Sequence, residues 1–138
     1  MTQISRNHGS MSMTKSRLQK LMLNPNLLLQ RGIVTVLSDN TAVQKFRQIN
    51  DKSVLYFTAT WCPPCKAISP KYEKMSDDYP EVAFGKVDVD ENSDAAIDFE
   101  ISAVPTFVLF QGETVSNKMT GADPMALEQS VKDLIRSQ

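Results

Sequence analysis

The chain has 138 residues, of which 41% are hydrophobic and 22% charged, with a formal net charge of −1. This length allows one domain with a substantial apolar core, so disulfide staples are not needed for stability. The near-zero charge gives no indication of a nucleic acid or an anionic membrane as partner, and the apolar run LMLNPNLLL is too short and too interrupted to span a bilayer.

Residues 1–32 differ in composition from the rest of the chain. The first acidic residue is Asp39, and the segment before it carries several serines and the basic residues Arg6, Lys15, Arg17, Lys20 and Arg31. A basic, serine-rich and acid-poor leader is typical of an organelle transit peptide. We therefore expect residues 1–32 to be a transit peptide or a disordered N-terminal extension. The corresponding localisation is mitochondrial, with a cytoplasmic protein as the alternative.

The remaining residues, 33–138, are predicted to form one domain that begins with a strand, a helix and a second strand. The segment IVTVL (33–37) is rich in β-branched residues. Ser38 then has a side chain suited to an N-cap, and apolar residues follow it at helical spacing. The segment SVLYFTAT (53–60) is apolar on both alternating faces, which predicts a strand buried on both sides. A helix with Pro70 in its interior follows, and we expect a kink there.

The second half of the domain continues the alternation of strands and helices. We predict a strand at 81–90, a short helix at 93–100 capped by Ser93, and a hairpin of strands 105–110 and 113–120 that turns at Gln111 and Gly112. Asp123 and Pro124 have the residue types that start a helix. The order predicts an α/β fold with a mixed, mostly parallel sheet of about five strands, flanked by about four helices.

The only cysteines, Cys62 and Cys65, lie between a predicted buried strand and a predicted helix. A helix N-terminus stabilises a thiolate, which is the reactive form in disulfide exchange. Pro63 fits the first helical position, where its missing N–H costs nothing, and Pro64 adds stiffness. We expect this stiffness to shift the balance between dithiol and disulfide, in a direction that the residues do not reveal. Cys65 is close enough to Cys62 to close a small ring and act as a resolving group.

Three other roles for the cysteine pair fit the sequence less well. A structural disulfide is disfavoured because a four-residue loop constrains the unfolded chain very little. A zinc site requires about four ligands, whereas the chain offers two cysteines and one remote histidine, His8. A pair of inert core cysteines conflicts with the position at a helix start. We therefore expect no bound metal.

The segment Trp61-Cys62-Pro63-Pro64-Cys65-Lys66 resembles the active site of the thioredoxin family, and the likeness runs from about Ile33 to Gln138. It includes the interior Pro70, the segment AVPTF (103–107), where the family carries a cis-proline facing the dithiol, and the segment TGAD (120–123). The resemblance implies a thioredoxin fold and a protein-disulfide reductase.

The resemblance also implies the roles of individual residues. Cys62 would attack a substrate disulfide, and Cys65 would resolve the resulting mixed disulfide. Trp61, Val104, Pro105 and Gly121 would form the surface that receives an extended substrate segment. The implied partners are disulfide-containing proteins and a thioredoxin reductase that supplies electrons from NADPH. We expect a monomer without bound cofactor, nucleic acid or membrane.

One position departs from the family pattern. The family usually has a buried aspartate six residues before the first cysteine, where this chain has Tyr56, while the accompanying lysine is present as Lys86. A phenol is a poor base at neutral pH. Tyr56 could bond to Lys86 and relay a proton through water, or it could fill space while Lys86 extends to solvent. We expect a slowed resolving step or one with a different pH dependence.

Two functions besides reduction remain open at the level of sequence. The proline pair could raise the redox potential and make the protein a disulfide oxidase or isomerase. Alternatively, the protein could be a non-enzymatic partner that docks according to the redox state of Cys62 and Cys65. Because about 30 mV corresponds to a tenfold change in the equilibrium constant, a measured potential separates reduction from oxidation.

Overall fold

The computed structural model describes residues 33–137. Residues 1–32 and Gln138 lie outside the described part, and the expected transit peptide lies there too. In chain order the elements are β1 (Thr35–Val36), α3 (Asn40–Ile49), β2 (Lys52–Thr58), α4 (Pro63–Asp78), β3 (Ala83–Asp88), α5 (Ser93–Asp98), β4 (Thr106–Gln111), β5 (Thr114–Thr120) and α6 (Pro124–Arg136). None of the described helices is long and apolar enough to cross a membrane.

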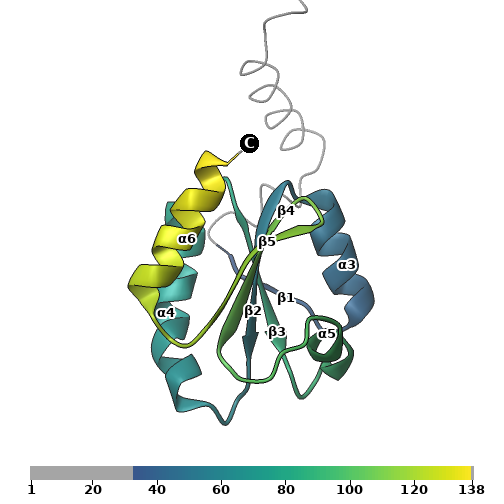
Figure 1. Ribbon diagram of the computed structural model, residues 1–138. Helices are drawn as coiled ribbons and strands as arrows, with labels where there is room; N and C mark the ends of the chain where they lie inside the picture. The colour runs from purple at the N-terminus through teal and green to yellow at the C-terminus, as the bar shows by residue number, and fades with distance from the viewer. Residues whose placement is uncertain (1–32, 138) are drawn as a thin grey trace, which may run out of the picture. The chain divides into compact units, whose positions relative to one another are not determined.

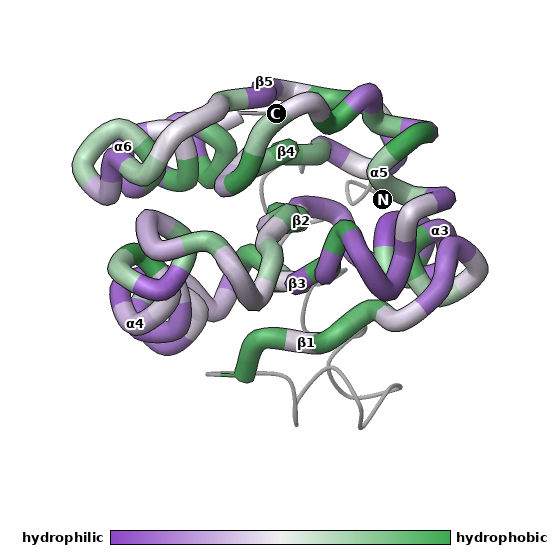
Figure 2. Tube along the Cα trace, turned by 90° about the horizontal axis from the view of Figure 1, so that it is seen from below, coloured by the Kyte–Doolittle hydropathy of each residue, from purple (hydrophilic) through white to green (hydrophobic). Residues whose placement is uncertain are grey.

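The described strands form one mixed sheet in the order β1-β3-β2-β4-β5. Both β1 and β2 pair with β3 in parallel, whereas β4 is antiparallel to β2 and β5 is antiparallel to β4. Figure 2 shows the strands stacked in this order, with α4 and α6 on one side of the sheet and α3 and α5 on the other. The predicted α/β class with an antiparallel hairpin at one side is confirmed.

Strand β2 is central in the sheet and buried on both faces, as its sequence predicted. Val54 and Tyr56 pack in the cluster formed with α4 and α6, and Leu55 and Phe57 pack in the cluster formed with α3 and α5. Figure 1 shows that β2 and β3 both end at the lower edge of the domain, where α4 begins. The carboxyl ends of parallel strands are the usual location of functional sites in open α/β sheets.

The caps of two helices differ from the sequence prediction by one residue. Asp39, not Ser38, caps α3, and its carboxylate accepts a hydrogen bond from the Ala42 amide. Asn92, not Ser93, caps α5 by accepting from the Ala95 amide. In both cases two adjacent residues have side chains that can cap a helix. The residue at which the helical backbone begins makes the bond. The predicted cap at Asp123 followed by Pro124 is confirmed.

All strands except β4 are shorter than predicted, and the hairpin turns one residue later. β1 covers only Thr35–Val36, although the apolar run extends on both sides of it. Gln111 pairs with Thr114, so the turn residues are Gly112 and Glu113 rather than Gln111 and Gly112. Gly112 has a φ of +62°, which favours glycine, and this requirement determines the position of the turn.

Candidate active site

The two cysteines lie at the first turn of α4 and are joined by a disulfide. Cys62 is the N-cap of the helix, and Pro63 and Pro64 occupy its first positions, as predicted. The Cα atoms of Cys62 and Cys65 are 5.3 Å apart, and both side chains are buried. Ala59 follows the buried strand β2 and leads into this turn. Its carbonyl oxygen accepts a hydrogen bond from the Cys62 amide at 3.3 Å.

The two prolines limit the backbone donors that the helix start can offer to sulfur. The Cys65 amide donates to Sγ of Cys62 at 3.2 Å, and the Lys66 amide donates to the carbonyl oxygen of Cys62, also at 3.2 Å. Pro63 and Pro64 have no N–H to contribute. An ordinary helix start has several free amides. Here the Cys65 amide is the donor to sulfur, so the expected stabilisation by the helix N-terminus depends on this one N–H.

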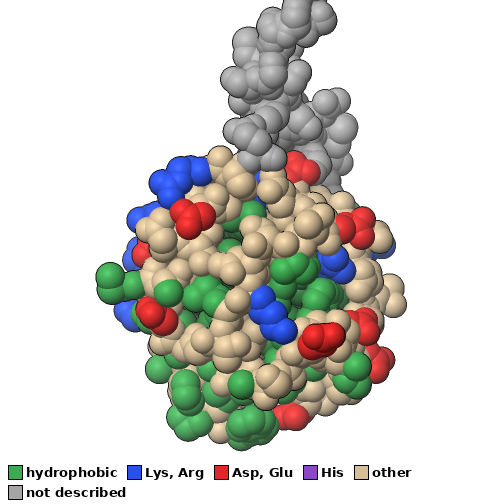
Figure 3. Space-filling model, in the orientation of Figure 1, with side chains coloured by type: hydrophobic (Ala, Val, Ile, Leu, Met, Phe, Trp, Pro, Cys, Tyr) green, Lys and Arg blue, Asp and Glu red, His purple; other side chains and the backbone are tan. Residues whose placement is uncertain are grey.

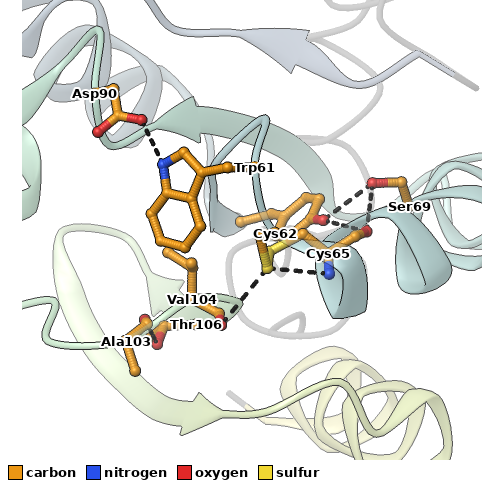
Figure 4. The surroundings of a disulfide bond; sticks show 9 residues. Trp61, Cys62, Cys65, Ser69, Asp90, Ala103, Val104 and Thr106 are labelled. Atoms are coloured by element: carbon orange, nitrogen blue, oxygen red, sulfur yellow. Dashed lines mark hydrogen bonds between the residues drawn. A yellow bond between two sulfur atoms is a disulfide. The ribbon is translucent and has the colours of Figure 1, made fainter.

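A loop before β4 faces the disulfide. Sγ of Cys62 lies 3.8 Å from the carbonyl oxygen of Val104, and the Val104–Pro105 peptide is cis, as the resemblance implied. The Gly121 amide donates to the carbonyl oxygen of Pro105 at 2.9 Å. In Figure 4, Val104 lies directly across from the sulfur of Cys62. The structure thus brings Val104, Pro105 and Gly121 together at one side of the cysteine pair.

Trp61 precedes the disulfide and is exposed to solvent. Its side chain is 65% exposed, and its indole Nε1 donates to Oδ2 of Asp90 at 2.8 Å. Hydrophobic side chains gather at the lower edge of the domain in Figure 3, where α4 begins in Figure 1. An exposed apolar surface beside a reactive group is a typical docking region for another chain.

Tyr56 is hydrogen-bonded to α4, and the bond to Lys86 that the sequence left open is not formed. Its hydroxyl donates to the carbonyl oxygen of Cys65 at 2.8 Å and lies 3.0 Å from Oγ of Ser69. Ser69 donates to the same Cys65 carbonyl at 2.9 Å. Lys86 is the register partner of Tyr56 in β3. Tyr56 therefore does more than fill space, because its hydroxyl is bonded to the backbone of the second cysteine and not to Lys86.

Three further residues contact this site and were not singled out from the sequence. Ser69 lies one helical turn after Cys65, so its spacing was a usable signal. Asp90 comes just after β3 and reaches Trp61 only through the fold. Thr106 donates to the Ala103 carbonyl at 2.7 Å and steadies the loop that carries Val104. The Trp61–Asp90 contact has no local sequence signature, whereas Thr106 lies within the segment AVPTF already noted.

The site is suited to two-electron redox chemistry at sulfur. A Cys62–Cys65 disulfide stores two electrons when it is reduced to a dithiol. Within residues 33–137 no group of three His, Cys, Asp or Glu side chains is placed to hold a metal ion. Val104 and Trp61 both lie beside the cysteine pair (Figure 4).

Comparison with known proteins identifies the family. A family model described as Thioredoxin matches residues 33–133. The chain belongs to the thioredoxin family. It is 45% identical over 101 residues to mitochondrial thioredoxin-3 of Saccharomyces cerevisiae, an alignment that covers 73% of this chain and 80% of the yeast protein. It is 47% identical over 78 residues to thioredoxin-1 of the same yeast, covering 56% of this chain and 76% of that protein.

Solved thioredoxin structures have the same fold. The oxidised form of mitochondrial thioredoxin 3 from Saccharomyces cerevisiae is 44% identical, with a TM-score of 0.71 over 73% of this chain and 95% of the yeast chain. A chain from a study of the thiol resolving mechanism in yeast mitochondrial 1-Cys peroxiredoxin is 42% identical, with a TM-score of 0.71, and covers 76% of this chain and 99% of that one.

The protein is a thioredoxin-type thiol–disulfide oxidoreductase, and its active-site disulfide joins Cys62 and Cys65. The fold and the disulfide-reductase activity that the resemblance implied are therefore confirmed.

Proposed function

We propose that Cys62 is the attacking cysteine and Cys65 the resolving cysteine. The Cys62 thiolate attacks a substrate disulfide, a Cys62–substrate disulfide forms, and the other substrate sulfur leaves as a thiolate. Cys65 then loses its proton and attacks Sγ of Cys62, which restores the intramolecular disulfide and releases the second substrate sulfur. Two electrons pass to the substrate, and its two thiolates take up protons. The 3.2 Å bond from the Cys65 amide to Sγ of Cys62 carries this assignment, because it favours negative charge on Cys62.

The substrate would bind as an extended segment along the Val104 loop. The carbonyl oxygen of Val104 lies 3.8 Å from Sγ of Cys62, so a segment pairing with the Val104 backbone would bring its disulfide to that sulfur. Trp61, Pro105 and Gly121 would complete this surface. Pro63 and Pro64 would keep the cysteine turn stiff, and no chemical step is assigned to Lys86. This arrangement suits protein disulfides in exposed, extended segments.

The electrons would come from NADPH through a thioredoxin reductase, and the protein would act as a monomer. We also infer that residues 33–138 form the thioredoxin domain and that residues 1–32 are a targeting extension for the mitochondrion. The relative named mitochondrial thioredoxin-3 supports this localisation, as does the basic, acid-poor composition of residues 1–32. The alternative remains a cytoplasmic protein with an N-terminal tail.

Reduction of insulin by the full chain with NADPH and a thioredoxin reductase tests this function. We expect turnover, measured as NADPH consumption, and its loss in Cys62→Ser. Absence of turnover in the parent, with a folded protein whose dithiol still forms and breaks, would contradict the proposal. In that case a more oxidising enzyme or a redox-gated binding partner would account for the same cysteine pair.

A further inference from the structure

Cys65, in the first turn of α4, is hydrogen-bonded through its backbone both to side chains from β2 and α4 and to the sulfur of Cys62. The carbonyl oxygen of Cys65 accepts from Tyr56 at 2.8 Å and from Ser69 at 2.9 Å. The other end of the same peptide group, the Lys66 amide, donates to the carbonyl oxygen of Cys62 at 3.2 Å. The Cys65 amide donates to Sγ of Cys62, also at 3.2 Å. Cys65 is thus held on both sides, by the hydroxyls and by Cys62.

Tyr56 is a rigid support for this network. Its side chain is 1% exposed, and its ring stacks on Phe107 with a centroid separation of 4.9 Å and an interplanar angle of 14°. The ring of Tyr72 packs against it from α4, also at 4.9 Å. A hydroxyl on a ring packed in this way has little freedom, so it fixes the position of the carbonyl to which it donates. Ser69 adds a second donor from within the helix.

We propose that the hydroxyls of Tyr56 and Ser69 are a positioning pair that holds the Cys65 backbone so that its amide stabilises the sulfur of Cys62. The two hydroxyls touch no reacting atom, and they act through the position of the Cys65 backbone, whose carbonyl they hold and whose amide reaches the sulfur. This role rests on the proposed function in one respect, the assignment of Cys62 as the attacking cysteine. This role differs from proton transfer. The two hydroxyls donate hydrogen bonds to the Cys65 carbonyl oxygen, and neither is required to take a proton from the Cys65 thiol.

The two hydroxyls should shift the redox equilibrium in a defined direction. A hydrogen bond to a thiolate is stronger than one to a neutral sulfur, so a well-aimed Cys65 amide stabilises the reduced protein more than the disulfide. Pro63 and Pro64 have no N–H, and the Lys66 amide is already bonded to the carbonyl oxygen of Cys62, so no other amide of the first turn can compensate. Loss of the hydroxyls should therefore favour the disulfide, which makes the remaining dithiol a stronger reductant. It should also slow the reaction of Cys62 with alkylating agents, since less of it is thiolate.

The chain offers a matched control for the removal of a buried phenol oxygen. Tyr72 is also 1% exposed, and its hydroxyl donates to the carbonyl oxygens of Gly85 at 2.7 Å and Val54 at 3.2 Å. These bonds join α4 to β2 and β3 and do not involve either cysteine. Tyr72→Phe therefore measures the general cost of losing a buried hydroxyl in the same core.

The experiment compares Tyr56→Phe, Ser69→Ala, the double variant and Tyr72→Phe in the full chain. The equilibrium constant against the glutathione couple and the rate of Cys62 alkylation by iodoacetamide at neutral pH are measured, with thermal unfolding as the check on stability. Because the two hydroxyls share one carbonyl, we expect each single variant to shift the equilibrium constant about two- to threefold and the double variant roughly tenfold, towards the disulfide. Tyr72→Phe should lower stability and leave both redox measurements unchanged.

The outcomes separate this inference from the function on which it rests. If Tyr56→Phe and Ser69→Ala lower stability but match Tyr72→Phe in equilibrium constant and alkylation rate, the positioning role is overturned. A shift towards the dithiol would overturn it as well. Peptide mass spectrometry identifies the cysteine that is alkylated first in the parent. If that cysteine is Cys65, the assignment of Cys62 as attacking residue fails, whatever the variants do.

Discussion

The indole of Trp61 is held by Asp90, a residue that follows a different strand. Nε1 of Trp61 donates to Oδ2 of Asp90 at 2.8 Å, although the tryptophan side chain is 65% exposed. The bond connects the loop before α4 with the end of β3, so the two loops at the active-site edge of the sheet are tied together (Figure 4). An exposed aromatic side chain held in one orientation loses less conformational entropy when a partner binds.

Asp90→Ala is expected to release Trp61 and weaken substrate binding. Trp61 is the only tryptophan in the chain, so its fluorescence reports directly on this contact. We expect acrylamide to quench it more strongly and insulin reduction to slow about two- to fivefold, the effect of losing one partly exposed hydrogen bond. Glu91→Ala removes the same charge one residue later and serves as control. Equal quenching in the two variants would contradict a specific Trp61–Asp90 contact.

The sequence predicted those parts of the fold and site that depend on local chemistry. The helix starts at Cys62 and at Asp123 were predicted because a capping side chain and a proline stand next to each other there. The caps of α3 and α5 were misplaced by one residue, because adjacent residues compete for each cap and only the backbone decides between them. The length of β1 was overestimated because an apolar run does not show where its partner strand ends.

Contacts between distant elements were the part of the site that the sequence did not reveal. Tyr56 was recognised as unusual, but its hydrogen-bond partners lie on α4, whereas the family pattern had suggested Lys86. Register in the sheet makes Tyr56 and Lys86 neighbours, and the direction of the long tyrosine side chain then carries its hydroxyl to the helix. Asp90 was missed for the same reason, since a surface acid after a strand has no pattern that names its partner.

Gly85→Ala is expected to destabilise the domain through overpacking. A Cβ at this position in β3 would lie 2.9 Å from Cδ1 of Leu37 and 3.1 Å from Cε2 of Phe46, both of them buried. Overpacking of this kind costs about 1–3 kcal/mol, which urea unfolding can measure. Leu37→Ala removes the closest atom, so the cost of Gly85→Ala should shrink in that background. An equal cost in both backgrounds would show that steric conflict with Leu37 is not the cause.

Gly112 and Gly121 are expected to differ in their tolerance of asparagine. An added Cβ meets no atom within 4 Å at either site, so only the backbone conformation matters. Gly112 has a φ of +62°, which asparagine adopts at little cost, whereas the φ of +112° at Gly121 lies outside that region. Gly121→Asn should cost about 1–3 kcal/mol in urea unfolding and Gly112→Asn well under about 1 kcal/mol. The reverse order would contradict this reading of the two turns.

Tyr79 is expected to ionise late. Its hydroxyl donates to Oε2 of Glu128 at 2.5 Å, and this bond to a carboxylate raises the pKa of Tyr79 from 10.0 to about 12. Because the raised pKa favours the protonated form in the folded protein, the stabilisation is fully present below pH 10 and is lost as the pH rises through about 12. Tyrosinate absorbance that is present in the parent and missing in Tyr79→Phe should therefore appear near pH 12.

Glu128→Gln tests the cause of this shift. Without the carboxylate, the ionisation of Tyr79 should move down towards pH 10, with circular dichroism confirming at each pH that the protein stays folded. If the Tyr79 ionisation already occurs near pH 10 in the parent, the bond to Glu128 does not hold the phenol proton.

Trapping of the mixed disulfide tests the roles of the two cysteines most directly. Reduced Cys65→Ser and Cys62→Ser variants of the full chain are mixed with insulin, and the intact mass of each product is measured after acid quenching. If Cys62 attacks and Cys65 resolves, Cys65→Ser accumulates an adduct with an insulin chain and Cys62→Ser accumulates almost none. An adduct that forms mainly on Cys65 in the Cys62→Ser variant would contradict the assignment, and with it the account of how this site reduces disulfides.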